Sequence, residues 1–245
     1  MKPINQVERY NRIWKCGDIL SPKIWSTWEI IKNFQGKRNL EIGPGNLPKI
    51  PIKGGFFIDI SQEVIEGLKS HGAKAVVGDA SNLPFKSRFF HLVVAMDVLE
   101  HIDDDQKAFF EIARVLKSGG FFLISVPLRK ELFSEFDIIV GHKRRYEIQE
   151  LEKILTKNQL KILKYRGPSF YLKKLSNWSD KLGLTQNLYK NENSLDFFHL
   201  PRSLVNFFLK AQAFIDKKGT PQWQTDIKAL ADYQEKHILI LCQKE

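Results

Sequence analysis

The chain has 245 residues, 43% of them hydrophobic, and its 38 Lys and Arg against 28 Asp and Glu give a formal charge of +10. This length allows one large domain or a domain with a cap. No apolar run of about 18 residues occurs, and the first residues lack the apolar segment of a signal peptide, so we predict a cytoplasmic protein without a spanning helix. Two cysteines, Cys16 and Cys242, are too few for a disulfide framework or a cysteine-based zinc site, and we predict no metal.

The first 36 residues are predicted to form a helical approach segment, because apolar residues recur at helical spacing over 21–35 and Gly36 follows. A short strand at 39–42 then ends in Gly43-Pro44-Gly45, and a second strand at 55–58 ends in Asp59 and Ile60. A glycine loop after a buried strand lets a ligand approach backbone N–H groups. A carboxylate on the next strand can accept hydrogen bonds from the two hydroxyls of a ribose. Together they indicate a ligand that contains a nucleoside.

Further along the chain, strands and helices alternate. A helix capped by Ser61 is predicted to run to about residue 70, and a strand at 74–78 ends in Asp79 and Ala80. The apolar run 91–96 ends in Met96 and Asp97; a helix beginning at 103–104 and a strand at 120–126 follow. Such alternation predicts a parallel sheet, in which ligands bind at the carboxyl ends of the strands. The glycine loop and the acids Asp59, Asp79 and Asp97 are all predicted to lie at that edge.

After residue 127 the pattern loosens. A basic loop at 141–146 (GHKRRY) precedes a predicted helix at 148–157 and strands at 159–165 and 237–242. We therefore predict one α/β domain made of residues 37–165 and 237–245, with a mainly helical insertion at 166–236, including a helix at 203–216, that covers the substrate. The basic, aromatic-rich stretch 161–190 could rest on an anionic membrane or receive a phosphorylated lipid-like substrate, or its aromatic residues could simply be core.

Two common nucleotide motifs fit the glycine loop poorly. A dinucleotide fingerprint requires a third glycine at the start of a helix, where this chain has Pro48, and an acid about 20 residues later, whereas Asp59 follows much sooner. A Walker loop requires a Gly-Lys-Ser/Thr ending, which this loop lacks. Neither an NAD site nor a P-loop is favoured.

The ordered segments LEIGPG, FFIDIS, VVGDASNLPF, HLVVAMDVLEHI and ARVLKSGGFFLISVP resemble the motif series of the Rossmann-like (class I) S-adenosylmethionine-dependent methyltransferases. The resemblance implies a three-layer sandwich with a mostly parallel seven-stranded sheet whose last strand is antiparallel. It further implies that S-adenosylmethionine is the cofactor and S-adenosylhomocysteine the product. By the same resemblance, Glu41, Gly43 and Gly45 line its methionine and ribose, Asp59 and Ile60 its ribose, Asp79 and Ala80 its adenine, and Met96 and Asp97 its sulfonium and amino-acid end.

The chain departs from that family at two places. Pro48 and Pro51 occupy the segment where relatives have a full helix after the glycine loop, so we expect at most a turn or two there. His91 stands where relatives often carry an acid, which we interpret as a surface difference.

In-line methyl transfer needs mainly positioning and exclusion of water, and a hydroxyl acceptor also needs a base. His101, His142 and Tyr146 are the candidate catalytic bases, and Arg144 and Arg145 are candidates for binding an anionic substrate. The motifs of amino-methylating and thiolate-dependent nucleic-acid enzymes are missing, which favours a small or lipid-linked acceptor. The positive charge leaves two alternatives open: an RNA methyltransferase, or a non-catalytic module that binds nucleic acid or a membrane. An NAD-dependent enzyme is a further, weaker alternative. The sequence does not indicate an oligomeric state.

Overall fold

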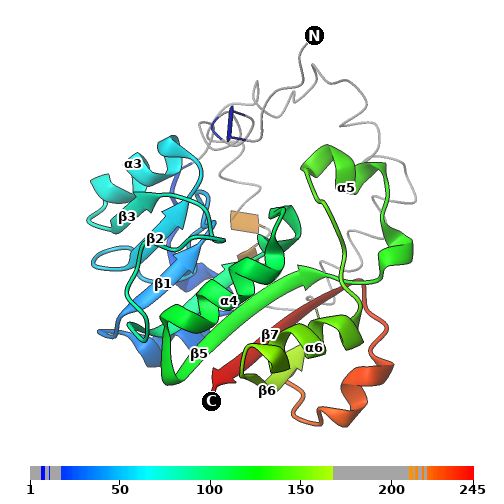
Figure 1. Cartoon of the computed structure of the whole chain (residues 1–245). Coiled ribbons are helices and arrows are strands. Elements are labelled where there is room, and N and C mark those ends of the chain that lie inside the picture. The colour runs from blue at the N-terminus through cyan, green and yellow to red at the C-terminus, as the bar shows by residue number, and fades with distance from the viewer. Residues whose placement is uncertain are drawn as a thin grey trace.

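The computed structural model describes residues 7, 8, 11, 18–167, 210, 211, 213, 214, 217 and 220–245. Within them, seven strands form one sheet in the order β3-β2-β1-β4-β5-β7-β6 (Figure 1). Neighbouring strands are parallel, except that β7 is antiparallel to both β5 and β6. This arrangement confirms the predicted mostly parallel sheet with an antiparallel last strand. The strands are β1 (Asn39–Ile42), β2 (Phe56–Asp59), β3 (Lys74–Val77), β4 (Phe90–Met96), β5 (Leu116–Pro127), β6 (Leu160–Arg166) and β7 (His237–Lys244).

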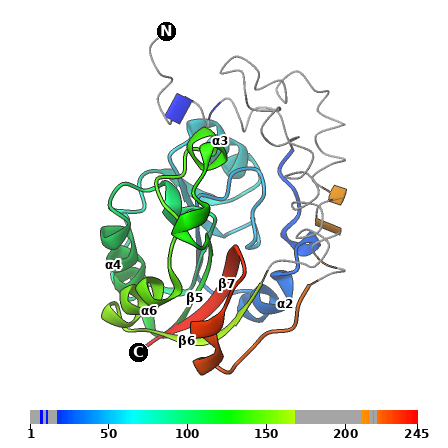
Figure 2. The ribbon, with the colours of Figure 1, turned by 90° about the vertical axis from the view of Figure 1, so that its right-hand side faces the viewer.

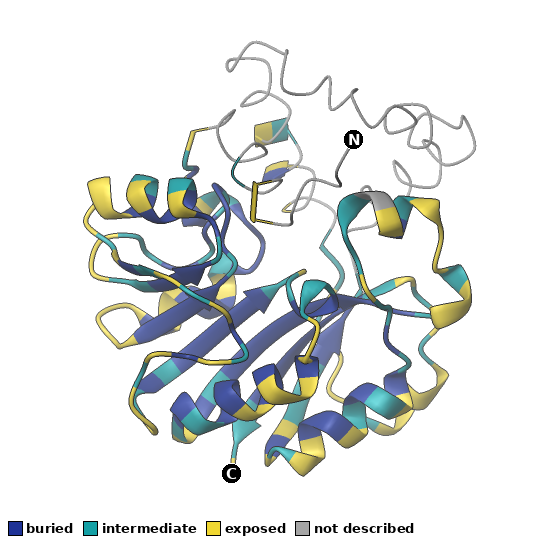
Figure 3. Ribbon diagram, turned by 45° about the horizontal axis from the view of Figure 1, so that its top comes forward, coloured by how far each residue is buried: buried dark blue, intermediate teal, exposed yellow. Residues whose placement is uncertain are grey.

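Helices cover both faces of the sheet. Figure 2 shows α4 (Asp105–Val115) and α6 (Ile148–Lys157) on one face and α2 (Trp28–Ile31) on the other. The side chains of β4 alternate accordingly: Val93 and Ala95 belong to the core under α4, and Leu92 and Val94 belong to the core that includes α3 (Gln62–Ser70). Burial on both faces explains why β4 is a continuous apolar run (Figure 3). The predicted three-layer sandwich is confirmed.

The helix caps agree with the sequence. The Ser61 hydroxyl accepts the N–H of Val64 at 3.4 Å, and the Asp104 carboxylate accepts the N–H of Lys107 at 3.0 Å. Each bond satisfies a backbone donor that the first turn of a helix otherwise leaves without a partner. The helix α6 has the bounds that were predicted.

Three elements differ from the prediction. The segment 21–35 is not one helix but three short pieces, η1 (Pro22–Ile24), α2 and η2 (Lys32–Phe34), because the backbone at Trp25 is extended. The extended turn places the indole of Trp25 3.7 Å from the Lys49 ammonium. The strand β5 starts at Leu116, and the glycines predicted to separate it from α4 lie instead in an irregularity of its pairing with β4.

The helix α5 (Glu135–Val140) was not predicted. Its signal is a capping box, in which Ser134 and Asp137 exchange bonds between side chains and backbone. The left-handed conformation of Gly141, with φ of +88°, ends the helix.

The segment between β1 and β2, which is described throughout, contains turns and no helix. This confirms the expectation from Pro48 and Pro51 of at most a turn or two. Several predicted features lie outside the described residues: most of the insertion 166–236, including most of its predicted helix at 203–216, the basic aromatic stretch beyond residue 167, and most of the first 17 residues, including Cys16. No helix in the described part of the chain has the length and hydrophobicity needed to cross a bilayer.

Candidate functional site

A pocket lies at the carboxyl ends of β1, β2, β3 and β4. The order of the strands reverses between β1 and β4, which is where parallel sheets bind their ligands. The cavity has a volume of about 210 Å³ and opens to solvent. Seven predicted site residues line it: Gly43, Asp59, Ile60, Asp79, Ala80, Asp97 and His101. The sequence reasoning missed six others: Ile42, Ile58, Gly78, Val98, Ile102 and Asp103.

Gly43 makes the first turn after β1. Its φ is +61°, and a Cβ at this position would lie only 2.6 Å from Cγ2 of Val98. Its N–H donates to the carbonyl of Ile58 at 2.8 Å, which ties the loop to β2. Both the backbone conformation and the close contact with Val98 therefore require glycine at this wall of the pocket.

Asp59 ends β2 with its side chain at the base of the glycine loop. The carboxylate accepts the N–H of Gly45 at 3.4 Å and that of Ser61 at 2.9 Å. Burial raises the pKa of Asp59 to about 6, although these backbone hydrogen bonds act in the opposite direction. At neutral pH the pocket thus presents an ionised carboxylate with capacity to accept further hydrogen bonds.

Glu41 lies outside the lining of the pocket. Its carboxylate accepts the N–H of Lys49 at 2.8 Å and that of Ile50 at 3.1 Å. Burial raises the pKa of Glu41 to about 7, and the Lys49 charge opposes that shift. Glu41 therefore holds the segment after the glycine loop in place through these two backbone hydrogen bonds. Gly45 and Met96 are also outside the lining, although Gly45 bonds to Asp59.

Asp79 and Ala80 follow β3 and form another wall of the pocket. Asp79 is exposed and accepts the N–H of Ser81 at 2.8 Å, whereas Ala80 is buried. The carboxylate of Asp79 thus retains acceptor capacity toward the opening.

Asp97 ends β4 in a left-handed conformation, with φ of +55°. This conformation is uncommon outside glycine and directs the side chain to two partners. The Asp97 carboxylate accepts hydrogen bonds from the Ser125 hydroxyl at 3.0 Å and from Nε2 of His237 at 2.5 Å. Desolvation acts to raise the pKa of Asp97, but the His237 charge and both hydrogen bonds hold it at about 2. At neutral pH, Asp97 is therefore an ionised carboxylate paired with His237, whose pKa it raises in turn.

Two histidines and a glutamate gather next to Asp97. His101 lies in the short helix η3 (Leu99–His101) and His142 lies just beyond α5, yet their rings are 4.7 Å apart. Nε2 of His142 lies 3.8 Å from Oε1 of Glu100, whose side chain is buried. Burial lowers the pKa of His142, and the Asp137 carboxylate acts against that shift. His101 lines the pocket, while His142 and Glu100 stand behind it.

Tyr146 is not placed as a base would be. Its side chain is only 1% exposed, and its hydroxyl donates to the Asp105 carboxylate at 2.8 Å. Burial raises the pKa of Tyr146 far above its usual value, with the Asp105 charge acting in the same direction. This geometry does not support the prediction that Tyr146 is a base, because Tyr146 belongs to the core that also contains α4.

The two arginines of the basic loop are also engaged within the protein. Arg144 pairs with Asp105 at 2.5 Å, and Arg145 pairs with Asp137 at 2.9 Å. Neither lines the pocket. In this arrangement they fasten the loop to α4 and α5, which does not support the predicted grip on an anionic substrate.

Residues 49–124 match the family model described as a methyltransferase domain. A tRNA (carboxymethyluridine(34)-5-O)-methyltransferase of Arabidopsis thaliana is 33% identical over 44% of this chain and 31% of its own length. A fatty-acid O-methyltransferase of Mycolicibacterium smegmatis is 25% identical over 69% of this chain and 57% of its own length. The chain thus spans less than two thirds of either relative.

Solved structures share the fold at lower identity. A methyltransferase of Thermotoga maritima, described as a possible histamine N-methyltransferase, has a TM-score of 0.56 at 18% identity and covers 100% of this chain and 97% of its own. Phosphoethanolamine N-methyltransferase 2 of Haemonchus contortus, solved with S-adenosyl-L-methionine, has a TM-score of 0.54 at 18% identity and covers 98% of this chain and 57% of its own.

Proposed function

This chain carries a Rossmann-like (class I) S-adenosylmethionine-dependent methyltransferase domain, and we propose that it transfers the methyl group of S-adenosylmethionine to a small or lipid-linked metabolite. One observation carries the proposal: carboxylates at three successive strand ends, Asp59, Asp79 and Asp97, surround a glycine loop in one pocket. Each of these acids matches a part of the cofactor that donates hydrogen bonds or carries positive charge.

The three carboxylates suggest where each part of S-adenosylmethionine binds. Asp59 accepts the ribose hydroxyls above the glycine loop, and Asp79 with the backbone of Ala80 receives the adenine edge. Asp97, which stays ionised down to a pH of about 2, lies beside the cationic sulfonium and amino-acid end. The reaction is in-line: the acceptor forms a bond to the methyl carbon while the carbon–sulfur bond breaks and leaves S-adenosylhomocysteine.

Catalysis of that step depends on which side chains reach the acceptor. Of the three predicted bases, only His101 lines the pocket. We therefore place the group that assists a hydroxyl acceptor at His101, with His142 supporting it from behind. Val98 and Ile102, which line the same wall, exclude water from the reacting atoms.

RNA is the second candidate acceptor. The charge of +10 favours an anionic partner, and the similarity to the plant tRNA methyltransferase reaches 33% over 124 residues. A non-catalytic module with this fold is the third. The cytoplasmic location stays a prediction from the sequence.

Incubating the protein with a cell extract and methyl-labelled S-adenosylmethionine distinguishes these three candidate functions. We expect the label to enter the low-mass or lipid fraction of a cell extract and to be insensitive to ribonuclease. Label in an RNA fraction that ribonuclease abolishes would replace the leading proposal with the second. No transfer to any fraction, by a protein that binds S-adenosylhomocysteine, would leave the non-catalytic module.

Cofactor binding should depend on pH through Asp59. Because the ionised carboxylate accepts the ribose hydroxyls and the pKa of Asp59 is about 6, we expect affinity for S-adenosylhomocysteine to fall by roughly tenfold per pH unit below pH 6. Isothermal titration between pH 5 and 8 measures this, and Asp59→Asn should abolish the dependence. A flat profile would contradict the role of Asp59.

The stability of the free protein should depend on the protonation of Asp59 in the opposite direction to the cofactor affinity. The folded pKa of Asp59 is raised above its unfolded value, so the folded state holds this proton more tightly. Protonation of Asp59 therefore stabilises the free fold as pH falls from about 6 to about 4.

A further inference from the structure

Glu100 is a fully buried residue whose side-chain oxygens make no hydrogen bond within the described part of the chain, although Oε1 lies 3.8 Å from Nε2 of His142. Its side chain has 0% exposure, and neither Oε1 nor Oε2 has a hydrogen-bond partner among the described residues. Burying a carboxylate without hydrogen bonds is costly, and such groups in native proteins are usually paired closely or bound to a cation. Glu100 is therefore the group in this domain that most needs an explanation.

The side chains around Glu100 are suited to a metal ion. Glu100, His101 and His142 each offer one ligand atom, and these atoms all lie within 4.8 Å of one another. Bonds of about 2.0–2.1 Å to a tetrahedral cation require ligand atoms about 3.3 Å apart. The side chains thus need to draw together by at most about 1.5 Å, which rotamer adjustment can supply.

Both histidines are oriented as metal ligands usually are. Nδ1 of His142 donates to the Asp137 carboxylate at 2.7 Å, and Nδ1 of His101 donates to the Gly141 carbonyl at 3.0 Å. Because a carbonyl only accepts, the proton of His101 is on Nδ1, and Nε2 is the nitrogen that can bind a cation. A carboxylate or carbonyl behind a histidine fixes its ring and raises its basicity as a ligand.

The outer groups are themselves held in place. Asp137 also accepts a hydrogen bond from Arg145 at 2.9 Å and one from the N–H of Ser134 at 2.9 Å. The N–H of Lys143 donates to the Glu100 carbonyl at 2.8 Å and fastens the loop of His142 to η3. The segment after α5 and the end of β4 are thereby kept together before any ion is bound.

We propose that Glu100, His101 and His142 form a binding site for a divalent transition-metal cation. Two imidazole nitrogens and one carboxylate favour Zn²⁺ or a similar ion over Mg²⁺ or Ca²⁺, which prefer oxygen ligands. Three protein ligands leave a fourth position open. The prediction of no metal considered cysteines, and this site contains none.

The role of this metal site in methyl transfer rests on the proposed function. Since His101 also lines the pocket, a cation bound there can contact a hydroxyl of the acceptor and lower its pKa. The hydroxyl proton then passes to water, the oxygen bonds to the methyl carbon, and the carbon–sulfur electron pair stays on sulfur. His101 thus assists the acceptor as a metal ligand, and no separate base is needed.

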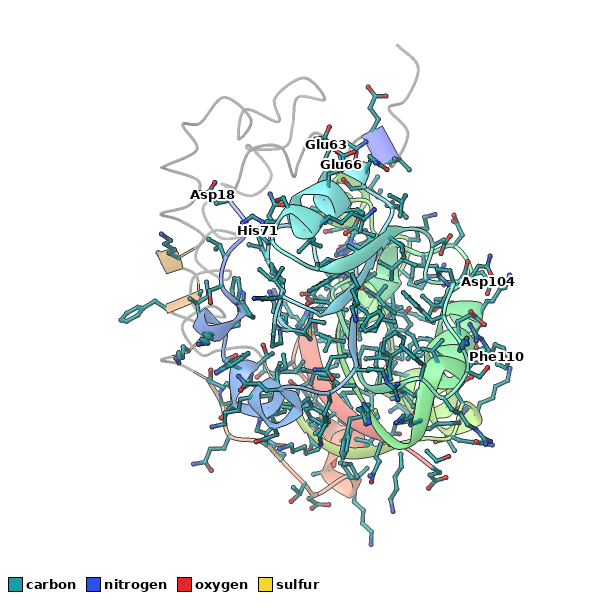
Figure 4. All side chains as sticks on the ribbon, turned by 90° about the vertical axis from the view of Figure 1, so that its left-hand side faces the viewer. Asp18, Glu63, Glu66, His71, Asp104 and Phe110 are labelled. Atoms are coloured by element: carbon teal, nitrogen blue, oxygen red, sulfur yellow. The ribbon has the colours of Figure 1, made fainter. Side chains whose placement is uncertain are left out.

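Titration of the chelator-treated full chain with ZnCl₂, followed by calorimetry, tests the site. We expect one ion per chain for the wild type and at least tenfold weaker binding for both Glu100→Gln and His142→Gln. The control is His71→Gln, because His71 is exposed at the end of α3, on the outer surface of the molecule (Figure 4). No saturable binding, or equal affinity of the wild type and both cluster variants, would overturn the proposal.

Melting curves show whether a variant that does not bind Zn²⁺ is still folded. Without metal, Glu100→Gln should melt no lower than the wild type, because an amide replaces a buried carboxylate, and Zn²⁺ should raise the melting temperature of the wild type only. If one cluster variant does not fold, the other decides. S-adenosylhomocysteine binding is measured on the same samples: its failure refutes the proposed function, and failure of Zn²⁺ binding alone refutes only this site.

Discussion

Replacing Asp59 with alanine is expected to weaken binding of S-adenosylhomocysteine by roughly 100-fold or more. In the proposed site the ionised carboxylate accepts two ribose hydroxyls, and hydrogen bonds to a charged group contribute about 1.5–3 kcal/mol each. Losing both costs at least about 3 kcal/mol, and every 1.4 kcal/mol is about a factor of ten in affinity. Isothermal titration at pH 7.5 measures the change.

Two further variants show whether the loss is specific. Asp59→Asn keeps one acceptor oxygen, so its affinity should lie between those of the wild type and the alanine variant. Glu66→Ala removes one negative charge from the exposed outer side of α3 (Figure 4) and should leave affinity unchanged. If Asp59→Ala binds as the wild type does, the ribose assignment is wrong.

Replacing Gly43 with alanine is expected to destabilise the fold and to abolish cofactor binding. The φ of +61° costs an L-residue about 1–2 kcal/mol, and the new Cβ would lie 2.6 Å from Cγ2 of Val98. Because Val98 lines the pocket, relief of this clash moves a wall of the site. We expect the free energy of unfolding to fall by roughly 2–4 kcal/mol, which a urea melt can measure.

Gly36 provides a matched control for Gly43. Its φ is +74°, but nothing lies within 4 Å of a Cβ built there. Gly36→Ala should therefore show the backbone cost alone, about 1–2 kcal/mol, with normal cofactor binding. Adding Val98→Ala to Gly43→Ala should restore part of the lost stability. Equal costs for the Gly36 and Gly43 variants, with cofactor binding retained in both, would contradict this account of the glycine loop.

The sequence predicted best what depends on local pattern. Strand ends were found because buried parallel strands are continuous apolar runs followed by polar residues, and this located Asp59, Asp79 and Asp97. The prolines after the glycine loop predicted the missing helix because their effect is local. The start of α4 at Asp105 followed from the cap that Asp104 supplies.

Contacts between distant segments were beyond sequence reasoning. His237 reaches Asp97 only because β7 enters the sheet antiparallel beside β5. His142 meets Glu100 because α5 and its closing glycine turn the chain back over η3. No periodicity marks such pairs. The Ser134–Asp137 capping box was the available local signal for α5.

The central claim is that the strand-end pocket binds S-adenosylmethionine. Thermal melting of the wild type with S-adenosylhomocysteine and, separately, with NAD tests it most directly, since a ligand that binds only the folded state raises the melting temperature. The account predicts a concentration-dependent rise with S-adenosylhomocysteine that Asp59→Ala largely loses, and no rise with NAD. A rise with NAD and none with S-adenosylhomocysteine would contradict it.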